Sequence, residues 1–187
     1  MQPRKQHLID TALILFNQFG YHATGIDLIL AESGVSKATL YKHFRSKEAL
    51  ILAALQLRHD QVVSKLKAKI SENKKSQKSA EPAENILVIF DDLDEWFNSD
   101  TFFGCNFINV SAEYADPAHP IKLFATKHKQ AIVDIIAEQL MTKENHKENQ
   151  QKADQIGLLI EGAIVMAHTR GMKQSALIAK EMAKNLF

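Results

Sequence analysis

The chain has 187 residues, of which 45% are apolar and 24% charged, and its formal net charge is +1. This composition excludes collagen-like and disordered chains, and the single cysteine excludes a scaffold held together by intrachain disulfides. A globular protein of this length buries roughly 70% of its unfolded surface and forms one or two domains.

No segment has the charge pattern and apolar core of a signal peptide, and no apolar run reaches the roughly 18 residues that a transmembrane helix needs. A lone cysteine, Cys105, fits a reducing compartment. We therefore expect a cytoplasmic protein without membrane association.

The charges are unevenly distributed along the chain. Residues 1–70 carry ten Lys or Arg and five Asp or Glu, a net charge of +5, whereas the remainder carries 13 basic and 17 acidic residues, a net charge of −4. This asymmetry favours a polyanionic partner for the N-terminal region, although solvated charged faces produce the same pattern.

Apolar residues recur at helical spacing along nearly the whole chain, and Gly and Pro are scarce, which predicts an all-α fold of about nine helices. The first four helices are predicted over residues 3–19, 26–32, 37–43 and 47–70. Gly20 and Gly34 follow the first two helices, and Ser36 and Ser46 are placed to cap the third and fourth.

Residues 71–84 contain no apolar side chain larger than Ala and are predicted to be a polar connector. Beyond it, helices are predicted over residues 86–97, 104–115, 121–140, 153–170 and 175–187, with a loop over residues 142–151. No internal repeat is present.

Residues 26–43 have the helix, tight turn and short helix of a helix-turn-helix, whose second helix enters the DNA major groove. Lys37 and Ala38 lie in the first turn of that helix, where a side chain can contact base edges. The same pattern is also compatible with a short capped helix in an ordinary bundle.

The stretch from Arg4 to Leu55, and above all GVSKATLYKHFRSKEAL, closely resembles the DNA-binding domain of TetR-family transcriptional regulators. The resemblance implies a DNA-binding head over residues 1–50 and a ligand-binding and dimerisation body over residues 51–187. By this likeness, the residues expected to contact DNA are Thr24, Gly25, Ser36, Lys37, Ala38, Thr39, Tyr41, Lys42, His43 and Lys47. Gly25 departs from the Ser or Thr that is usual in the family, so its side-chain phosphate contact is lost.

Aromatic and apolar side chains of the body are first of all candidates for the core, and together they are also candidates for the wall of a small-molecule cavity between helices. The residues selected are Phe90, Trp96, Phe103, Cys105, Phe107 and Met166.

Cys105 belongs to the segment GCNFINVSAEYADPAHP, which resembles the corresponding part of several TetR-family regulators, including one whose cysteine senses electrophiles. One interpretation is an inert buried thiol. The other is a reactive sensor, because the start of a helix stabilises a thiolate.

Small residues on the last two helices let backbones approach closely and predict the interface of a homodimer, although a monomer core can use the same face. The predicted interface residues are Ala153, Gly157, Ile160, Ala163, Ile164, Ala167, Ala179 and Ala183.

These features predict a regulator, most simply a repressor, that binds an inverted-repeat operator in double-stranded DNA as a homodimer and is released by a small apolar or aromatic effector. The alternatives are release by an electrophile or oxidant at Cys105, and a helical ligand carrier that does not bind DNA. No cofactor is expected, because the histidines lack metal-ligand spacing, and no catalytic constellation points to an enzyme.

Overall fold

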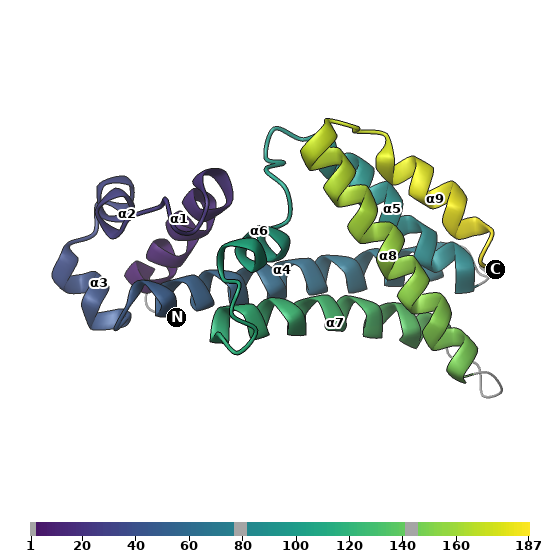
Figure 1. The fold of residues 1–187 in the computed structure, drawn as a ribbon, viewed down its shortest axis with the longest axis horizontal. Helices are drawn as coiled ribbons and strands as arrows, with labels where there is room; N and C mark the ends of the chain where they lie inside the picture. Colours follow the sequence, from purple (N-terminus) through teal and green to yellow (C-terminus); the bar gives the residue numbers. More distant parts are fainter. Residues whose placement is uncertain (1–2, 77–81, 141–145) are drawn as a thin grey trace. The chain divides into compact units, whose positions relative to one another are not determined.

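The computed structural model of the protein describes residues 3–76, 82–140 and 146–187. Within these ranges the chain forms nine helices and no strand, which confirms the predicted all-α fold (Figure 1). The helices are α1 Pro3–Phe19, α2 Ile26–Ser33, α3 Lys37–His43, α4 Lys47–Ser76, α5 Pro82–Phe97, α6 Asn106–Glu113, α7 Pro120–Leu140, α8 His146–Arg170 and α9 Ser175–Lys184.

Three helices, α4, α5 and α8, are several residues longer than the sequence pattern predicts, and α5 begins at Pro82, within the expected connector. Helix α4 continues to Ser76, through the first part of the expected connector, and Lys74 and Lys75 lie in its last turn, where positive charge stabilises the negative end of a helix. Residues 77–81 of that connector lie outside the described residues.

Helix α8 begins at His146, so the predicted loop is wrong for residues 146–151. Lys, Glu and Gln favour helix even where no apolar stripe is present, and Glu148 pairs with Lys152 one turn later at 3.2 Å. The remaining loop residues, 142–145, lie outside the part of the chain that the structure describes.

The chain divides into two compact units. The first comprises the residues up to Gln61 together with Cys105–His128. Each of its first four helices contributes a fully buried side chain to the core, and these include Leu8, Phe16, Ile29, Leu40 and Leu50. The expected division at residue 50 separates DNA binding from ligand binding and dimerisation rather than two compact units, and it stays a prediction.

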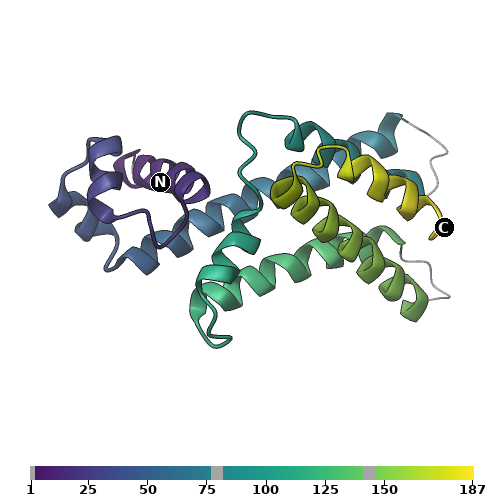
Figure 2. The ribbon, with the colours of Figure 1, turned by 45° about the horizontal axis from the view of Figure 1, so that its top comes forward.

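The second unit comprises Val62–Gly104 and Lys129–Phe187. Helices α8 and α9 lie side by side in both views and pack on α5 (Figure 1 and Figure 2). Fully buried Ile86, Phe90 and Phe97 supply the α5 side of this core. No helix among the described residues combines the length and the hydropathy that crossing a bilayer requires.

Candidate DNA-binding interface

The turn between α2 and α3 has the tight geometry of a helix-turn-helix. Gly34 ends α2 in the left-handed conformation, with φ at 63°, and its N–H donates to the Leu30 carbonyl at 3.0 Å. Left-handed backbone favours glycine, and a Cβ added at Gly34 would meet no atom within 4 Å, so the backbone angle alone accounts for this residue. The Val35 N–H donates to the Ser33 hydroxyl at 3.3 Å, which holds the turn against the end of α2.

Ser36 caps α3 as the sequence predicts. Its backbone is extended, and its hydroxyl oxygen accepts the Thr39 N–H at 3.2 Å. The Ser36 and Thr39 hydroxyls are also joined at 2.8 Å. Because these two side chains hold each other, the first turn of α3 is fixed before any partner binds.

Helix α3 turns one apolar side chain inward and leaves its other face open. Leu40 is fully buried, whereas Lys37, Ala38, Tyr41 and Lys42 are exposed. The Lys37 ammonium lies 3.6 Å from the Asp27 carboxylate of α2, and both groups are solvated, so this ion pair contributes little to stability.

Lys47, at the start of α4, already forms a hydrogen bond within the head. Its ammonium donates to the His22 carbonyl at 3.1 Å. Partial burial lowers the pKa of Lys47, and the nearby carboxylates of Glu113 and Glu48 oppose that shift. Ser46 caps α4 through the Ala49 N–H at 3.2 Å, and His43 is half-buried.

Thr24 lies inside the head. Its side chain is 0% exposed, and its hydroxyl donates to the Gly20 carbonyl at 2.7 Å. This burial argues against the expected phosphate contact. Gly25 is the N-cap of α2 without a side-chain cap, and a Cβ there would meet nothing within 4 Å.

The head matches the model of the TetR_N family, bacterial regulatory proteins of the tetR family, over residues 8–54. YxaF of Bacillus subtilis, an uncharacterized HTH-type transcriptional regulator, is 29% identical over 183 residues, which are 95% of this chain and 91% of YxaF. A TetR-family transcriptional regulator from Streptomyces coelicolor has a crystal structure that superposes with a TM-score of 0.83 at 28% identity, over 100% of this chain and 89% of that one. The head is therefore a TetR-family DNA-binding domain, and the whole chain is similar in sequence and fold to TetR-family transcriptional regulators.

Some relatives are similar over the head only. FasR of Mycolicibacterium smegmatis, an HTH-type transcriptional activator, is 48% identical over 61 residues, which are 33% of this chain. The alignment spans only 28% of the length of FasR. The body is therefore where this protein differs most from such relatives.

The structure distributes the six predicted effector residues over both units of the protein. Phe90, Trp96, Phe103 and Met166 belong to the second unit, and Cys105 and Phe107 to the first. The Trp96 ring packs edge-on against Phe102 at 4.9 Å, and Phe107 stacks on His128 at 3.5 Å. Phe90 is fully buried and Cys105 nearly so, while Phe103 and Met166 are exposed. The common cavity stays a prediction.

The predicted dimerisation residues face the interior of the chain itself. All eight are buried within the single chain: Ala153, Gly157, Ile160, Ala163, Ile164, Ala167, Ala179 and Ala183. A Cβ added at Gly157 would lie 3.0 Å from the Val133 side chain of α7, so the small residues serve close packing between neighbouring helices. The predicted homodimer interface stays a prediction, and two of these residues, Ala163 and Ala179, also line a groove on α8 and α9.

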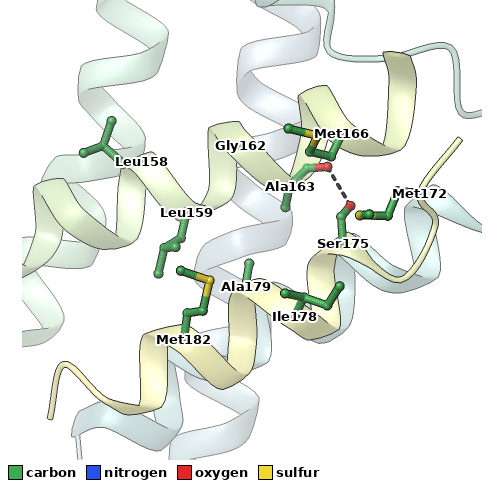
Figure 3. Close-up of a pocket in the computed structure, with 10 residues that line it drawn as sticks. All are labelled: Leu158, Leu159, Gly162, Ala163, Met166, Met172, Ser175, Ile178, Ala179 and Met182. Carbon is green, nitrogen blue, oxygen red and sulfur yellow. Dashed lines mark hydrogen bonds between the residues drawn. The ribbon is translucent and has the colours of Figure 1, made fainter. Parts of the chain in front are cut away.

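Helices α8 and α9 together form a shallow apolar groove, which we call the α8–α9 groove (Figure 3). It is lined by Leu158, Leu159, Gly162, Ala163, Met166, Met172, Ser175, Ile178, Ala179 and Met182. Large apolar side chains along it, such as Leu158, Ile178 and Met182, are exposed to solvent. Sequence periodicity selected the small residues of these helices and missed the large exposed ones. Small residues suit a helix crossing within one chain as well as one between chains, so spacing alone does not decide which they form.

The sequence argument also missed a contact between α6 and the head. The Glu113 carboxylate accepts the N–H groups of Tyr21 at 2.8 Å and His22 at 2.5 Å. Asn106 donates to the Tyr21 hydroxyl at 3.2 Å, and burial, the largest influence, raises the pKa of Tyr21 well above its ordinary value. One sequence signal for this contact is an acidic residue at the end of a helix, where the helix dipole disfavours it.

Proposed function

We propose that this protein is a TetR-family regulator that binds an inverted-repeat operator as a homodimer, with α3 of each copy in the major groove, and represses transcription until a small effector releases it. The observation that carries the proposal is the open face of α3, where Lys37, Ala38 and Tyr41 are exposed on a helix whose first turn is already capped. Preformed donors on an exposed recognition helix suit base contacts, which need fixed geometry.

Phosphate contacts are proposed for Ser36, Thr39, Tyr41, His43 and Lys47, which lie on α3 or at the ends of the neighbouring elements. Lys47 retains a partly exposed ammonium beside the His22 carbonyl, so it can approach a phosphate without leaving the head. Such contacts supply affinity for any sequence and make it dependent on salt.

The homodimer is proposed to form through the α8–α9 groove. One helix-turn-helix contacts few bases, and an inverted repeat matches the symmetry of a two-fold dimer. Leu158, Ile178 and Met182 give the groove the exposed apolar surface that a stable interface buries. The dimer thereby uses the face of α8 and α9 that the chain's own packing leaves open.

Repression and release by an apolar or aromatic effector complete the proposal. FasR is an HTH-type transcriptional activator, so similarity in the head alone does not decide between repression and activation. Cys105 is 8% exposed, which restricts attack by an electrophile and supports reversible effector binding over covalent modification as the trigger.

The test is operator binding by fluorescence anisotropy, first with the DNA upstream of the protein's own gene. Lys37→Ala should weaken specific binding by about 1–3 kcal/mol and relax base preference, because it removes a base-edge contact. Tyr41→Ala should weaken binding to all sequences and reduce its salt dependence. Lys67→Ala, at an exposed position of α4 beyond the head, is the matched control and should bind as the wild type does. Equal affinity of all four proteins would refute the proposed interface.

A further inference from the structure

The turn that joins α1 to α2, residues 20–25, is held from outside the head by Glu113, the last residue of α6. One carboxylate oxygen accepts the Tyr21 N–H at 2.8 Å, and the other accepts the His22 N–H at 2.5 Å. The His22 imidazole Nδ1 lies 3.2 Å from the second oxygen. Both carboxylate oxygens are therefore engaged by one short segment of the head.

Four further contacts surround this carboxylate. Tyr114, directly after Glu113, stacks on the His22 ring with the ring centroids 4.8 Å apart, and it lies tilted against the His119 ring at 4.7 Å. Lys47 donates to the His22 carbonyl, and Asn106 at the start of α6 donates to the Tyr21 hydroxyl. Tyr21 and His22 are thus each held at two points by α4 or α6. We call these contacts, with Glu113 at their centre, the α6–head joint.

The backbone at Gly20 is fitted to the joint. Its φ is 89°, and a Cβ added there would lie 3.2 Å from the Glu113 carboxylate. Glycine is therefore favoured twice at this position, by the backbone angle and by the approach of α6. The tight approach lets the carboxylate meet the two N–H groups directly after Gly20.

Glu113 does not stabilise its own helix. The C-terminal end of a helix carries partial negative charge, and a carboxylate there is unfavourable unless a donor or a cation offsets it. The donors here are the two N–H groups of the α1–α2 turn. Hydrogen bonds to a charged group are among the stronger ones in proteins, so this contact is able to fix the turn.

Holding the α1–α2 turn also holds the recognition helix, α3. Helices α1, α2 and α3 share one core, with Phe16, Ile29 and Leu40 fully buried in it, so they move together. A constraint on the segment between α1 and α2 is therefore a constraint on α3.

We propose that Glu113 is a positioning residue for DNA binding, which holds the head on α6 in the orientation that places the two recognition helices on the operator. This inference rests on the proposed DNA-binding function. Glu113 touches no DNA itself, so its loss should lower affinity for the operator, where two heads must fit one spacing, and leave non-specific binding intact.

The deciding variant is Glu113→Gln in the full-length protein. The amide keeps the shape of the side chain but places an NH₂ donor against one of the two N–H groups, so only one hydrogen bond survives. We expect the amide that loses its acceptor, that of Tyr21 or that of His22, to exchange with solvent about 10-fold faster or more. We also expect operator affinity to fall roughly 5- to 50-fold, in the range of coupling between sites, with non-specific affinity and the salt slope unchanged.

Two variants sharpen the comparison. Glu113→Asp keeps the charge but is one methylene shorter, so it should retain part of the operator affinity and serves as the second probe if Glu113→Gln does not fold. Glu161→Gln changes a half-buried glutamate that pairs with Lys129 at 2.7 Å in the second unit, and it should behave as the wild type in both assays.

Each outcome bears on the inference. Faster exchange with unchanged operator affinity would overturn the positioning role, and unchanged exchange would overturn the joint itself. Equal losses of specific and non-specific affinity would mean that the fold of the head is disrupted rather than its orientation changed, and this result would also overturn the positioning role. A wild-type protein that binds no DNA specifically would instead refute the proposed function, with the exchange measurement still reporting on the joint.

Discussion

A charge placed in the α8–α9 groove should separate the two copies of the regulator without unfolding either. The substitution is Leu158→Glu. Leu158 is 72% exposed in the single chain, so replacing it should change the unfolding free energy of the monomer by no more than about 0.5 kcal/mol. The dimer should respond very differently.

The size of the effect on assembly follows from burial. Fully burying a leucine side chain contributes about 1.5–3 kcal/mol, and a two-fold interface buries two copies, so their loss amounts to about 3–6 kcal/mol. This corresponds to a rise in the dimer dissociation constant of about a hundredfold to ten-thousandfold. Unpaired carboxylates at the interface add to the penalty.

Light scattering across a concentration series measures the dissociation constant, and chemical unfolding measures monomer stability. Ala163→Glu is the informative contrast, because Ala163 is 4% exposed and a carboxylate there should destabilise the fold itself. Thr126→Glu, at an exposed position of α7, adds the same charge elsewhere and should leave the dimer intact. A Leu158→Glu protein that dimerises as tightly as the wild type, or a wild type that is monomeric at micromolar concentration, would refute the groove as the interface.

Three further substitutions test individual packing arguments by urea unfolding. Gly104→Ala should lower the free energy of unfolding by at least about 1–2 kcal/mol, because φ is 83° and the new Cβ would lie 2.6 Å from His168 Nδ1. A stability equal to that of the wild type would contradict this. Adding His168→Ala to the same protein should recover the steric part of the loss. Gly25→Ser should raise stability by up to about 1 kcal/mol, since φ is −78° and the hydroxyl can cap α2, and a lower melting temperature would speak against it. Tyr21→Phe should cost about 1–3 kcal/mol by leaving buried Asn106 without its hydroxyl partner. Burial raises the pKa of Tyr21, so the contribution of this residue to the free energy of unfolding should be complete below about pH 10 and should decrease as the pH rises further. If the stability of Tyr21→Phe falls with alkaline pH as steeply as that of the wild type, Tyr21 is not the cause.

The sequence predicted the head well because its determinants are local. Gly34 and Ser36 act within three or four residues of their own positions, through a left-handed turn and a hydroxyl cap, and both appear in the structure where the pattern placed them. Thr24 is the exception. Its position in the chain suggested a phosphate contact, but its hydroxyl donates to a carbonyl four residues earlier and lies in the core.

The body was harder to predict because its faces are assigned by contacts between distant segments. The small residues of α8 and α9 are compatible with close packing inside the chain or between chains, and spacing alone does not distinguish the two. The structure decides this for Gly157, whose neighbour Val133 lies on another helix at contact distance. Large apolar residues such as Leu158, Ile178 and Met182 are left in solvent, and they line the groove together with the small residues Gly162, Ala163 and Ala179.

The α6–head joint is the most distant of these contacts, since Tyr21 and Glu113 are 92 residues apart in the chain. No periodicity connects such positions, but an electrostatic conflict marks one of them. Glu113 lies at the negative end of a helix and forms no pair within that helix, so a carboxylate there needs donors from another segment. Gly20 marks the other, because its backbone angle brings the next two N–H groups together and its missing side chain admits the carboxylate. The unfavourable carboxylate of Glu113 at a helix end and the space left by Gly20 are therefore the two sequence signals for this joint, and through the joint for the position of the DNA-binding head.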